Sequence, residues 1–437
     1  MRITAREAAD AVGGELIGPD VTFDGASIDT RTLVAGQLFV PVVADRDGHD
    51  FIPSALTTGA PAYLTARPPL AGSAVVVDDT SRALWALGGH ARSLLCDRVI
   101  AITGSVGKTT VKDLVAGGLA GQFATHATHA SYNNELGVPL TLLGAPDGVD
   151  AVVLELGARF PGDIAGLRDL CRPSIGVITS IGTAHAEHLG GPEGVAEEKS
   201  SLIDRLAPDG YAILNDVECG PDVRSRTEAT VVTFGTTSGD VRARVLLRDE
   251  ELRPTVRIDS PWGHGEITLS VRGDHQAANA AAAVATAVTA GVEFDRALAG
   301  VASAQGSPLR AEFWRAPSGL RVLNDTYNAN PASMEAALRT LDLVDAPRRV
   351  AVLGEMAELG EGSATAHLQV GALAASLGIE VIAVGGAPYG GTPAADVDEA
   401  LAMVERLAPD SVVLLKASRS VGLDRLATSL RAGEVTR

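Results

Sequence analysis

Residues 99–115 read VIAITGSVGKTTVKDLV, and this segment carries the strongest structural signal in the chain. Its first part, 99–102, is a short apolar run rich in β-branched residues, which is typical of a buried parallel strand. The segment TGSVGKTT follows directly at 103–110, and an amphipathic helix is expected from Val111 onward. Strand, glycine loop and helix in this order form a phosphate-binding arrangement, because glycines let the backbone wrap around an anion and amide groups at the helix start point at it.

The spacing of the glycines is shorter than in the common phosphate-binding loop. Two residues separate Gly104 from Gly107, whereas the common P-loop has about four between its glycines. An ordinary glycine-rich turn between a strand and a helix is the alternative interpretation. The Lys-Thr pair that follows favours nucleotide binding, because Lys108 would reach the β- and γ-phosphates and the hydroxyl group of Thr109 would bind Mg²⁺.

The composition limits the classes of protein to consider. A chain of 437 residues with 46% hydrophobic residues is long enough for about two to four domains with their own cores. No apolar run reaches the length of a membrane span, the N-terminal residues lack the apolar segment of a signal peptide, and the three cysteines show no metal or disulfide spacing. The net charge of −18 argues against a nucleic-acid partner. We therefore expect a cytoplasmic monomer without membrane insertion.

The order of the apolar segments predicts an α/β fold with three domains. A small α/β domain is expected at 1–96, a domain that holds the phosphate loop on a mainly parallel sheet at 97–305, and a Rossmann-like domain at 306–437. Alternating polar and apolar residues over 241–271 predict antiparallel strands at the side of the central sheet. Strands of the third domain are expected at 320–324, 350–353, 381–384 and 412–415.

Polar residues follow the predicted central strands at their carboxyl ends, where ligands of open parallel sheets collect. Glu155 ends an apolar strand, and a carboxylate there is well placed to bind Mg²⁺ beside the phosphate loop. His185 follows the strand expected at 174–180, although a lone histidine at such a place is more often a hydrogen-bonded loop residue. Lys199, in the helix expected at 192–206, is by its own sequence context a surface lysine with charged neighbours.

Three further segments are rich in residues that favour turns. The segment DGHD at 47–50 predicts a tight turn with a helix cap, NNE at 133–135 predicts a polar loop before a helix, and NDTYNANP at 324–331 predicts a strand, a loop and a helix cap. Each segment could instead bind a ligand, and the residue types alone leave both interpretations open.

Taken in order, these segments resemble the Mur ligase family over nearly the whole chain. The most specific motifs are TGSVGKTT at 103–110, NNELGVP at 133–139, NDTYNANP at 324–331 and LGEMAELG at 353–360. The last two motifs are similar to those of the branch that joins D-alanyl-D-alanine to UDP-N-acetylmuramoyl-tripeptide, the last cytoplasmic step of peptidoglycan precursor synthesis. This resemblance implies an ATP-dependent amide ligase that works through an acyl phosphate and releases ADP and phosphate.

The resemblance also implies the cofactors and the residues that act on them. The cofactors are ATP and a pair of Mg²⁺ ions, and Lys199 matches the lysine that Mur ligases carry as a carbamate. The catalytic residues implied are Lys108, Glu155, His185 and Lys199. The metal ligands implied are Thr109, Glu155, His185 and the carbamylated Lys199. The residues implied to bind ATP are Gly104, Ser105, Gly107, Lys108, Thr109, Thr110, Asn279, Arg310, Asp325, Tyr327 and Asn328.

The substrates implied by the resemblance are a UDP-linked muramoyl tripeptide and D-alanyl-D-alanine. The residues expected by the UDP-sugar are Ser27, Thr30, Arg31, Asp47 and His49. The residues expected to line the central cleft are Asn133, Asn134 and Glu135.

The chain departs from the family pattern in two places. Val43-Ala44-Asp45-Arg46 stands where the family often has Lys-Gly-Glu-Arg, and Glu198-Lys199-Ser200-Ser201 stands where it has Ala-Lys-Gly-Glu. One alternative is therefore a Mur-like ligase of another pathway, with a different acid and amine. The other is a non-catalytic nucleotide-binding regulatory protein, against which the intact Lys108, Glu155, His185 and Lys199 argue.

Overall fold

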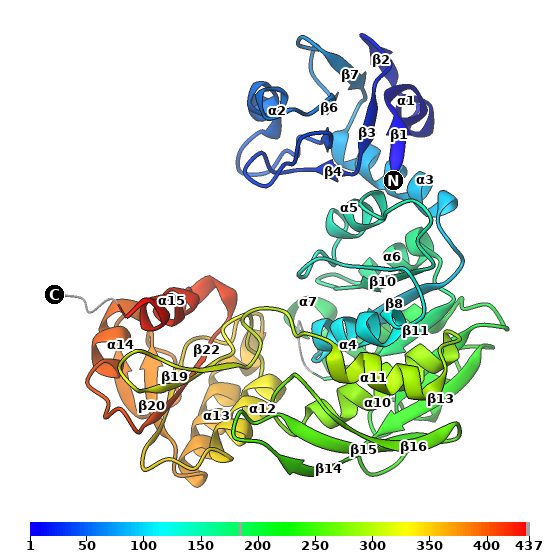
Figure 1. Ribbon diagram of the computed structural model, residues 1–437. Coiled ribbons are helices and arrows are strands. Elements are labelled where there is room, and N and C mark those ends of the chain that lie inside the picture. Colours follow the sequence, from blue (N-terminus) through cyan, green and yellow to red (C-terminus); the bar gives the residue numbers. More distant parts are fainter. Residues whose placement is uncertain (183–185, 434–437) are drawn as a thin grey trace.

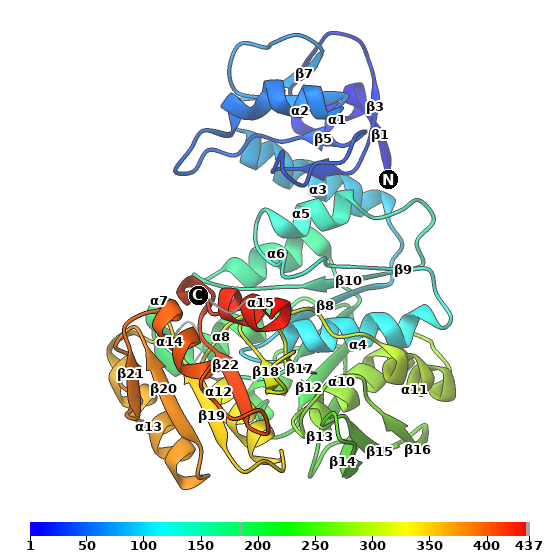
Figure 2. The same ribbon diagram turned by 60° about the vertical axis from the view of Figure 1, so that its left-hand side comes forward.

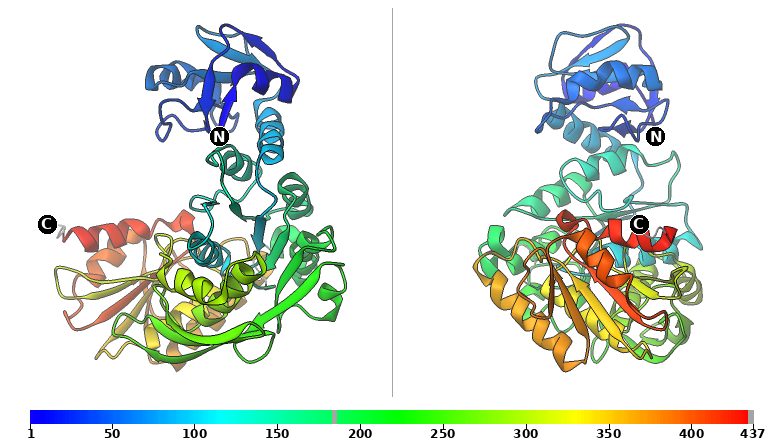
Figure 3. Two further views of the ribbon diagram at one scale, coloured as in Figure 1. Left: turned by 45° about the vertical axis from the view of Figure 1, so that its right-hand side comes forward. Right: turned by 90° about the vertical axis from the view of Figure 1, so that its left-hand side faces the viewer.

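The computed structural model describes residues 1–182 and 186–433 and consists of three units, each with its own main sheet (Figure 1). These sheets have five, nine and six strands in chain order, and the expected boundaries after residues 96 and 305 fall between them. The predicted α/β fold with mainly parallel sheets is confirmed. The first unit lies at one end of the central unit, and the third unit lies against the side of the central unit (Figures 1 and 3).

The first unit is a small α/β sandwich in which the sheet order is β2-β7-β6-β5-β4. Thr4 caps α1 in a capping box with Glu7, and Asp47 caps η1 by accepting a hydrogen bond from the backbone N–H of His49 at 2.9 Å. The turn with a helix cap predicted at 47–50 is therefore confirmed. The elements are β1 (Arg2–Thr4), α1 (Ala5–Val12), β2 (Glu15–Ile17), β3 (Thr22–Asp24), β4 (Ala26–Ser27), β5 (Leu38–Phe39), η1 (Gly48–Phe51), α2 (Ile52–Thr58), β6 (Ala62–Thr65) and β7 (Ser73–Val76).

Helix α3 (Thr80–Leu94), for which the sequence analysis gave no prediction, joins the first unit to the central unit. It packs on α5 (Gly137–Leu143) and α6 (Asp163–Cys171). Gly88 allows the close approach to α5, because a Cβ atom at this position would lie 2.7 Å from the Cβ atom of Pro139. The buried Arg92 donates to the carbonyl oxygens of Cys171 at 2.5 Å and Arg172 at 3.1 Å, which fixes α3 to the end of α6.

The central unit is a nine-stranded sheet with the order β16-β15-β14-β13-β12-β11-β8-β10-β9. The sheet is parallel from β9 to β14, and the pairs β14–β15 and β15–β16 are antiparallel, as predicted for 241–271. Its strands are β8 (Val99–Thr103), β9 (Thr125–Ala127), β10 (Ala151–Glu155), β11 (Ile175–Ile178), β12 (Tyr211–Asn215), β13 (Thr230–Gly235), β14 (Val241–Arg248), β15 (Pro254–Ser260) and β16 (Gly263–Thr268).

Helices cover both faces of this sheet, which explains why β8 is buried at every position and apolar from Val99 to Ile102. Val99 and Ala101 belong to the core shared with α3 and α6, whereas Ile100 and Ile102 belong to the core shared with α4 (Lys108–Ala120) and α10 (Gln276–Thr289). The other helices of the unit are α7 (Ala186–Leu189), α8 (Gly191–Ser200), η2 (Ser201–Ile203), α9 (Pro221–Arg224) and α11 (Phe294–Ser303).

The third unit is a six-stranded sheet with the order β17-β18-β22-β19-β20-β21, parallel except for the β17–β18 pair (Figure 2). The last strand, β22, therefore lies between β18 and β19. The elements are β17 (Glu312–Arg315), β18 (Arg321–Asn324), α12 (Pro331–Asp342), β19 (Arg349–Leu353), η3 (Gly360–Gly362), α13 (Ser363–Ser376), β20 (Glu380–Val384), β21 (Thr392–Ala394), α14 (Val397–Val404), β22 (Val412–Lys416), η4 (Arg419–Val421) and α15 (Asp424–Ala432). Within 1–182 and 186–433, no helix combines the length and the apolar character needed to span a membrane.

Candidate functional site

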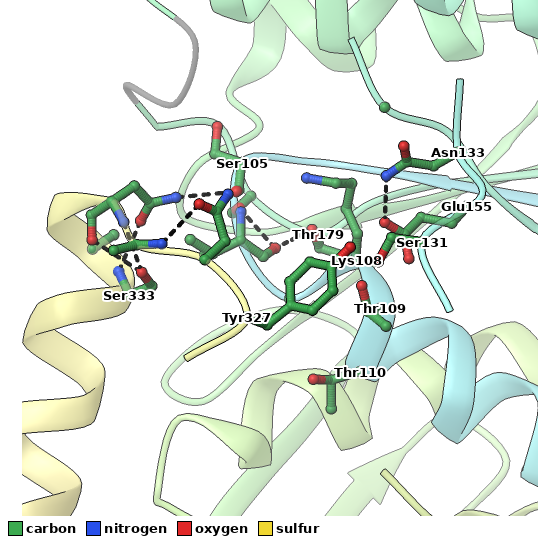
Figure 4. A pocket seen from close by; sticks show the side chains of 18 of the residues that line it. Ser105, Lys108, Thr109, Thr110, Ser131, Asn133, Glu155, Thr179, Tyr327 and Ser333 are labelled. Carbon is green, nitrogen blue, oxygen red and sulfur yellow. Dashed lines mark hydrogen bonds between the residues drawn. The ribbon is translucent and has the colours of Figure 1, made fainter. Parts of the chain in front are cut away.

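A cleft of about 1150 Å³ opens between the central unit and the third unit, at the carboxyl ends of β8 and β10. The phosphate loop and the first turn of α4 form its floor, and the segment 325–333 of the third unit faces them. Figure 4 shows the ring of Tyr327 beside Lys108 and Thr109, so the two units meet directly over the loop.

The phosphate loop needs glycine at both predicted positions. Gly104 has φ +147°, and a Cβ atom there would lie 2.0 Å from Oγ1 of Thr179. Gly107 has φ +82°, and its Cβ atom would lie 2.8 Å from Oδ1 of Asn279. Because α4 begins at Lys108, directly after this second glycine, its free amide groups lie at the cleft and favour an anion there.

Lys108 folds back over the loop and donates a hydrogen bond from Nζ to the carbonyl oxygen of Gly104 at 2.6 Å. Burial lowers the pKa of Lys108, and the nearby carboxylate of Glu155 opposes this shift. The ammonium group and the helix start therefore place positive charge on the same side of the cleft.

Glu155 lies at the end of β10 and is buried, with 1% of its surface exposed. Its Oε1 accepts a hydrogen bond from Nδ2 of Asn133 at 2.7 Å (Figure 4). Its Oε2 is buried and has no hydrogen-bond partner among the described residues. A buried carboxylate oxygen without a partner is costly, so this atom fits a cation.

Lys199 lies near the end of α8 with none of its surface exposed, so the interpretation as a surface lysine is wrong. Its Nζ atom has no hydrogen-bond partner among the described residues. Burial, together with the positive charge of Lys108 and against the opposing effect of Glu198, lowers the pKa of this amine to about 7. Sequence could not predict this burial, because the charged residues Glu197 and Glu198 directly precede Lys199 in α8.

The third unit and the segment before it bring Arg310, Asp325 and Tyr327 to the loop. Arg310 donates from Nη2 to Oγ1 of Thr109 at 2.8 Å, and its guanidinium carbon lies 4.2 Å from the centre of the Tyr327 ring. The Thr109 hydroxyl therefore accepts a hydrogen bond from a cation in this structure, and would have to exchange it to bind a metal.

Helix α10 closes the floor of the cleft. Asn279 donates from Nδ2 to Oε1 of Gln276 at 2.7 Å, and its side chain packs against Gly107. Gln276 in turn contacts Nε2 of His275 at 2.9 Å. This chain of contacts orients the Asn279 amide toward the loop.

The structure brings most of the predicted cleft residues together. The predicted residues that line the cleft are Ser105, Gly107, Lys108, Thr109, Thr110, Asn133, Asn134, Glu135, Glu155, Asn279, Arg310, Asp325, Tyr327 and Asn328. Gly104 belongs to the loop and packs against Thr179 and Ser180, Lys199 is buried, and His185 lies outside the described residues.

The residues that were predicted to contact the UDP-sugar all lie in the first unit and do not line this cleft. The His49 ring is buried and uses both nitrogens within the protein: Nδ1 contacts Oδ1 of Asp47 at 2.6 Å, and Nε2 accepts from the backbone N–H of Ala66 at 3.0 Å. Arg31 is paired with Asp29 at 2.6 Å and is largely exposed. In this structure the His49 ring thus connects Asp47 to the backbone of Ala66, and the Arg31 side chain is exposed to solvent.

Several cleft residues were missed by the sequence analysis. Lys416 is buried and donates from Nζ to Oδ2 of Asp325 at 2.5 Å. Asn330 donates to the backbone carbonyl of Ser105 at 3.5 Å and so connects the third unit to the phosphate loop. The sequence signal that could have indicated Lys416 is its position directly after the predicted strand 412–415. Only the strand order, with β22 next to β18, places it beside Asp325.

The described residues offer few metal-binding groups. Across 1–182 and 186–433, no three or more His, Cys, Asp or Glu side chains are grouped so that they could hold a metal ion. The donors that fit a cation at the loop are the free Oε2 of Glu155 and the Thr109 hydroxyl. A further anionic ligand at Lys199 would require the amine to carry a carboxyl group.

Together the fold and the cleft define an α/β enzyme of the phosphate-loop class. The family model for the Mur ligase middle domain matches residues 102–287, and that for the Mur ligase glutamate ligase domain matches residues 309–419. The chain belongs to the Mur ligase family.

Curated relatives match over nearly the full length. UDP-N-acetylmuramoyl-tripeptide–D-alanyl-D-alanine ligase from Escherichia coli (strain K12) is 34% identical over 448 residues, which cover 98% of this chain and 98% of that protein. The enzyme of the same name from Bacillus subtilis (strain 168) is 34% identical and covers 85% of this chain and 82% of its own.

Solved structures agree with this relationship. A crystal structure of MurF from Acinetobacter baumannii superimposes with a TM-score of 0.88 at 31% identity, covering 99% of both chains. MurF ligase from Thermotoga maritima, solved in complex with ADP, has a TM-score of 0.80 at 27% identity and covers 93% of this chain and 97% of its own.

Proposed function

We propose that this chain is the cytoplasmic ligase that joins D-alanyl-D-alanine to UDP-N-acetylmuramoyl-tripeptide, with ATP converted to ADP and phosphate. The observation that carries the proposal is a phosphate loop paired with the buried carboxylate of Glu155 in a cleft shared by two units. One oxygen of this carboxylate has no hydrogen-bond partner in the part of the chain that the structure describes. The match to the curated relatives extends over the first unit as well, which supports the same acid substrate.

The residues of the cleft suit the activation of a carboxylate. A carboxylate is a poor electrophile, so ATP must first convert it to an acyl phosphate. Lys108 and the amide groups at the start of α4 neutralise charge on the transferring phosphoryl group. The amine then attacks the acyl carbon and phosphate leaves. Because acyl phosphates hydrolyse, the Asp325–Asn328 segment also has to exclude water.

Glu155 and Thr109 are the residues that would hold Mg²⁺, which when bound neutralises phosphate charge. We assign a further ligand to Lys199 in carbamylated form. The amine is buried, has no hydrogen-bond partner within 1–182 and 186–433 and has a pKa lowered to about 7, so the neutral form that reacts with CO₂ is available at neutral pH. Labelled ¹³C-bicarbonate should give a carbamate resonance in the wild-type protein that Lys199→Ala lacks. A resonance of equal intensity in that variant would contradict the assignment.

The domain roles follow from the same proposal. We assign UDP-sugar binding to residues 1–96, ATP binding to 97–305 and closure over the nucleotide to 306–437. Within the first unit, Arg31 is exposed and Thr30 is half-buried, so we assign direct ligand contact to these two residues, whereas Ser27 is buried. Asp47 and His49 would act by holding the loop that faces the ligand.

Phosphate release with a panel of acids tests this function. The expected result is ATP-dependent phosphate release with UDP-N-acetylmuramoyl-tripeptide and D-alanyl-D-alanine together, and no release when either is omitted. A different acid or amine that is used preferentially would favour a ligase of another pathway. ATP binding without phosphate release on any combination would favour the non-catalytic alternative.

A further inference from the structure

The lysines of this chain are few and lie in the cleft or next to its lining. The sequence contains four lysines among 36 Lys and Arg residues, so nearly every cation is arginine. Lys108 and Lys416 line the cleft, Lys199 lies buried beside Lys108, and Lys112 is buried one helical turn after the loop. Arginine supplies the cation of every exposed side-chain ion pair in the described part of the chain. Lysine is thus retained where the geometry of an ammonium group differs most from that of a guanidinium group.

Lys112 on α4 is almost fully buried, with 3% of its surface exposed, and the proposed chemistry does not use it. Its Nζ atom donates to the carbonyl oxygens of Thr128 at 2.9 Å and Ala130 at 3.4 Å, and lies 2.8 Å from Oδ1 of Asp113. The three acceptors match the three donors of an ammonium group. Ala130 has φ +50°, a conformation that a non-glycine residue keeps only when neighbouring contacts enforce it.

The segment held by Lys112 is the one that surrounds Glu155. Oγ1 of Thr128 accepts from the backbone N–H of Glu155 at 3.0 Å, and Asn133 donates to Oε1 of Glu155 at 2.7 Å. The carbonyl of Asn133 accepts from the N–H of Gly157 at 2.7 Å. The position of the Glu155 carboxylate therefore depends on the segment 128–133.

Lys416 makes the same kind of contacts on the opposite wall. Its Nζ atom donates to the carbonyl oxygens of Asn328 at 2.9 Å and Asp325 at 3.5 Å, and to Oδ2 of Asp325 at 2.5 Å. It is 1% exposed at the end of β22. The segment that it holds, 325–328, faces the phosphate loop from the third unit.

We propose that Lys112 and Lys416 are positioning residues that fix the two walls of the nucleotide cleft, each by an ammonium group shared between two carbonyl oxygens and one carboxylate. A planar guanidinium group directs its donors into one plane and is larger, so it does not fit these convergent acceptors. This inference rests on the proposed nucleotide site but not on the identity of the acid or the amine.

The test compares Met and Arg substitutions at both lysines. ADP binding is measured by calorimetry with and without Mg²⁺, and amide hydrogen exchange is followed at 128–133 and 325–328. Lys112→Met should speed exchange at 128–133 only and weaken Mg²⁺-dependent ADP binding by about 10-fold, the usual effect of removing a group that orients a metal ligand. Lys416→Met should speed exchange at 325–328 only and weaken ADP binding by about 10-fold.

Arg92→Met is the matched control. Arg92 is also a buried cation that donates to backbone carbonyls, but it joins α3 to α6 away from the cleft. Its loss should lower the melting temperature and leave ADP affinity and exchange at both cleft segments unchanged.

The arginine variants decide between geometry and charge. Lys112→Arg and Lys416→Arg should bind ADP no better than the methionine variants. If a methionine variant fails to fold, the arginine variant is compared with the wild-type protein instead and should bind ADP more weakly. Wild-type affinity in the arginine variants would overturn the proposal, because charge alone would then suffice. Unchanged ADP affinity and exchange in the methionine variants would overturn it as well. Failure of the proposed function would appear differently, as ADP binding by the wild-type protein without amide formation.

Discussion

At the scale of single residues, the cleft depends on a few buried charges whose partners lie within the protein or are missing. Glu155 has one carboxylate oxygen bound to Asn133 and the other free, and Lys199 has no partner at all among the described residues. Lys108 instead rests on the carbonyl of Gly104. Unmatched buried charge is costly to a free protein and is typical of sites that bind ions.

Replacing Lys108 by alanine should remove ATP-dependent amide formation and leave the fold intact. Among the described residues its ammonium group hydrogen-bonds only to the loop carbonyl, whereas in the reaction it would neutralise the transferring phosphoryl group, so we expect a loss in kcat on the order of 100-fold or more. Phosphate release at saturating substrates and the melting temperature are measured together. Turnover at the wild-type rate would remove this loop from the reaction.

The pKa of Lys199 gives a stability change with a definite sign. Burial lowers it from 10.5 to about 7, so between these values the unfolded chain holds a proton that the folded protein lacks. The free energy of unfolding contributed by this group therefore rises with pH across that window. Lys199→Met removes the penalty, and its gain in melting temperature should be largest near about pH 6 and smallest near about pH 9.

Thermal unfolding in buffers free of CO₂ checks this expectation, since carbamylation would otherwise change the charge of the wild-type protein. A gain that is the same at every pH would mean that the pKa of Lys199 is not lowered.

At the scale of elements, periodicity and motif predicted the buried strands β8 and β10 and the antiparallel strands at the side of the sheet, because each pattern is local. Helix α3 was not predicted, because its apolar face is set by contacts with α5 and α6. The insertion of β22 between β18 and β19 could not be predicted either. That strand order places Lys416 beside Asp325, so the missed site residue follows from the missed topology. Lys199 was judged exposed for a similar reason, since its burial depends on distant segments.

The joint between α3 and α5 gives a prediction at this scale. Gly88→Val would place its Cβ atom about 2.7 Å from that of Pro139, and such overpacking costs roughly 1–3 kcal/mol. We expect a lower melting temperature with unchanged ADP affinity, because the contact lies outside the cleft. Gly89→Val, on the same helix with its nearest neighbour at 3.6 Å, serves as the control for lost helix flexibility. Equal melting temperatures for the two variants would contradict the role of this contact.

At the scale of the whole molecule, the nucleotide site is completed by groups of two units that meet across the cleft. Arg310 reaches Thr109, Asn330 reaches the backbone of Ser105, and Arg159 lies 3.8 Å from Glu358. A ligand that contacts both units adds free energy to the closed arrangement alone and shifts the population toward it. Small-angle scattering should therefore show a smaller radius of gyration with an ATP analogue and Mg²⁺ than without. Identical profiles, with the analogue shown to be bound, would contradict closure of the third unit.

The formation of an acyl phosphate is tested most directly by oxygen transfer. UDP-N-acetylmuramoyl-tripeptide labelled with ¹⁸O in its reacting carboxylate is incubated with the enzyme, ATP, Mg²⁺ and D-alanyl-D-alanine. The ¹⁸O content of the released phosphate and the amount of amide product are then measured by mass spectrometry. One carboxylate oxygen becomes the bridging oxygen of the acyl phosphate and leaves with phosphate when the amine attacks. We predict phosphate with a single ¹⁸O atom in amounts equal to the amide product, and unlabelled phosphate or a lack of amide would contradict the proposed reaction.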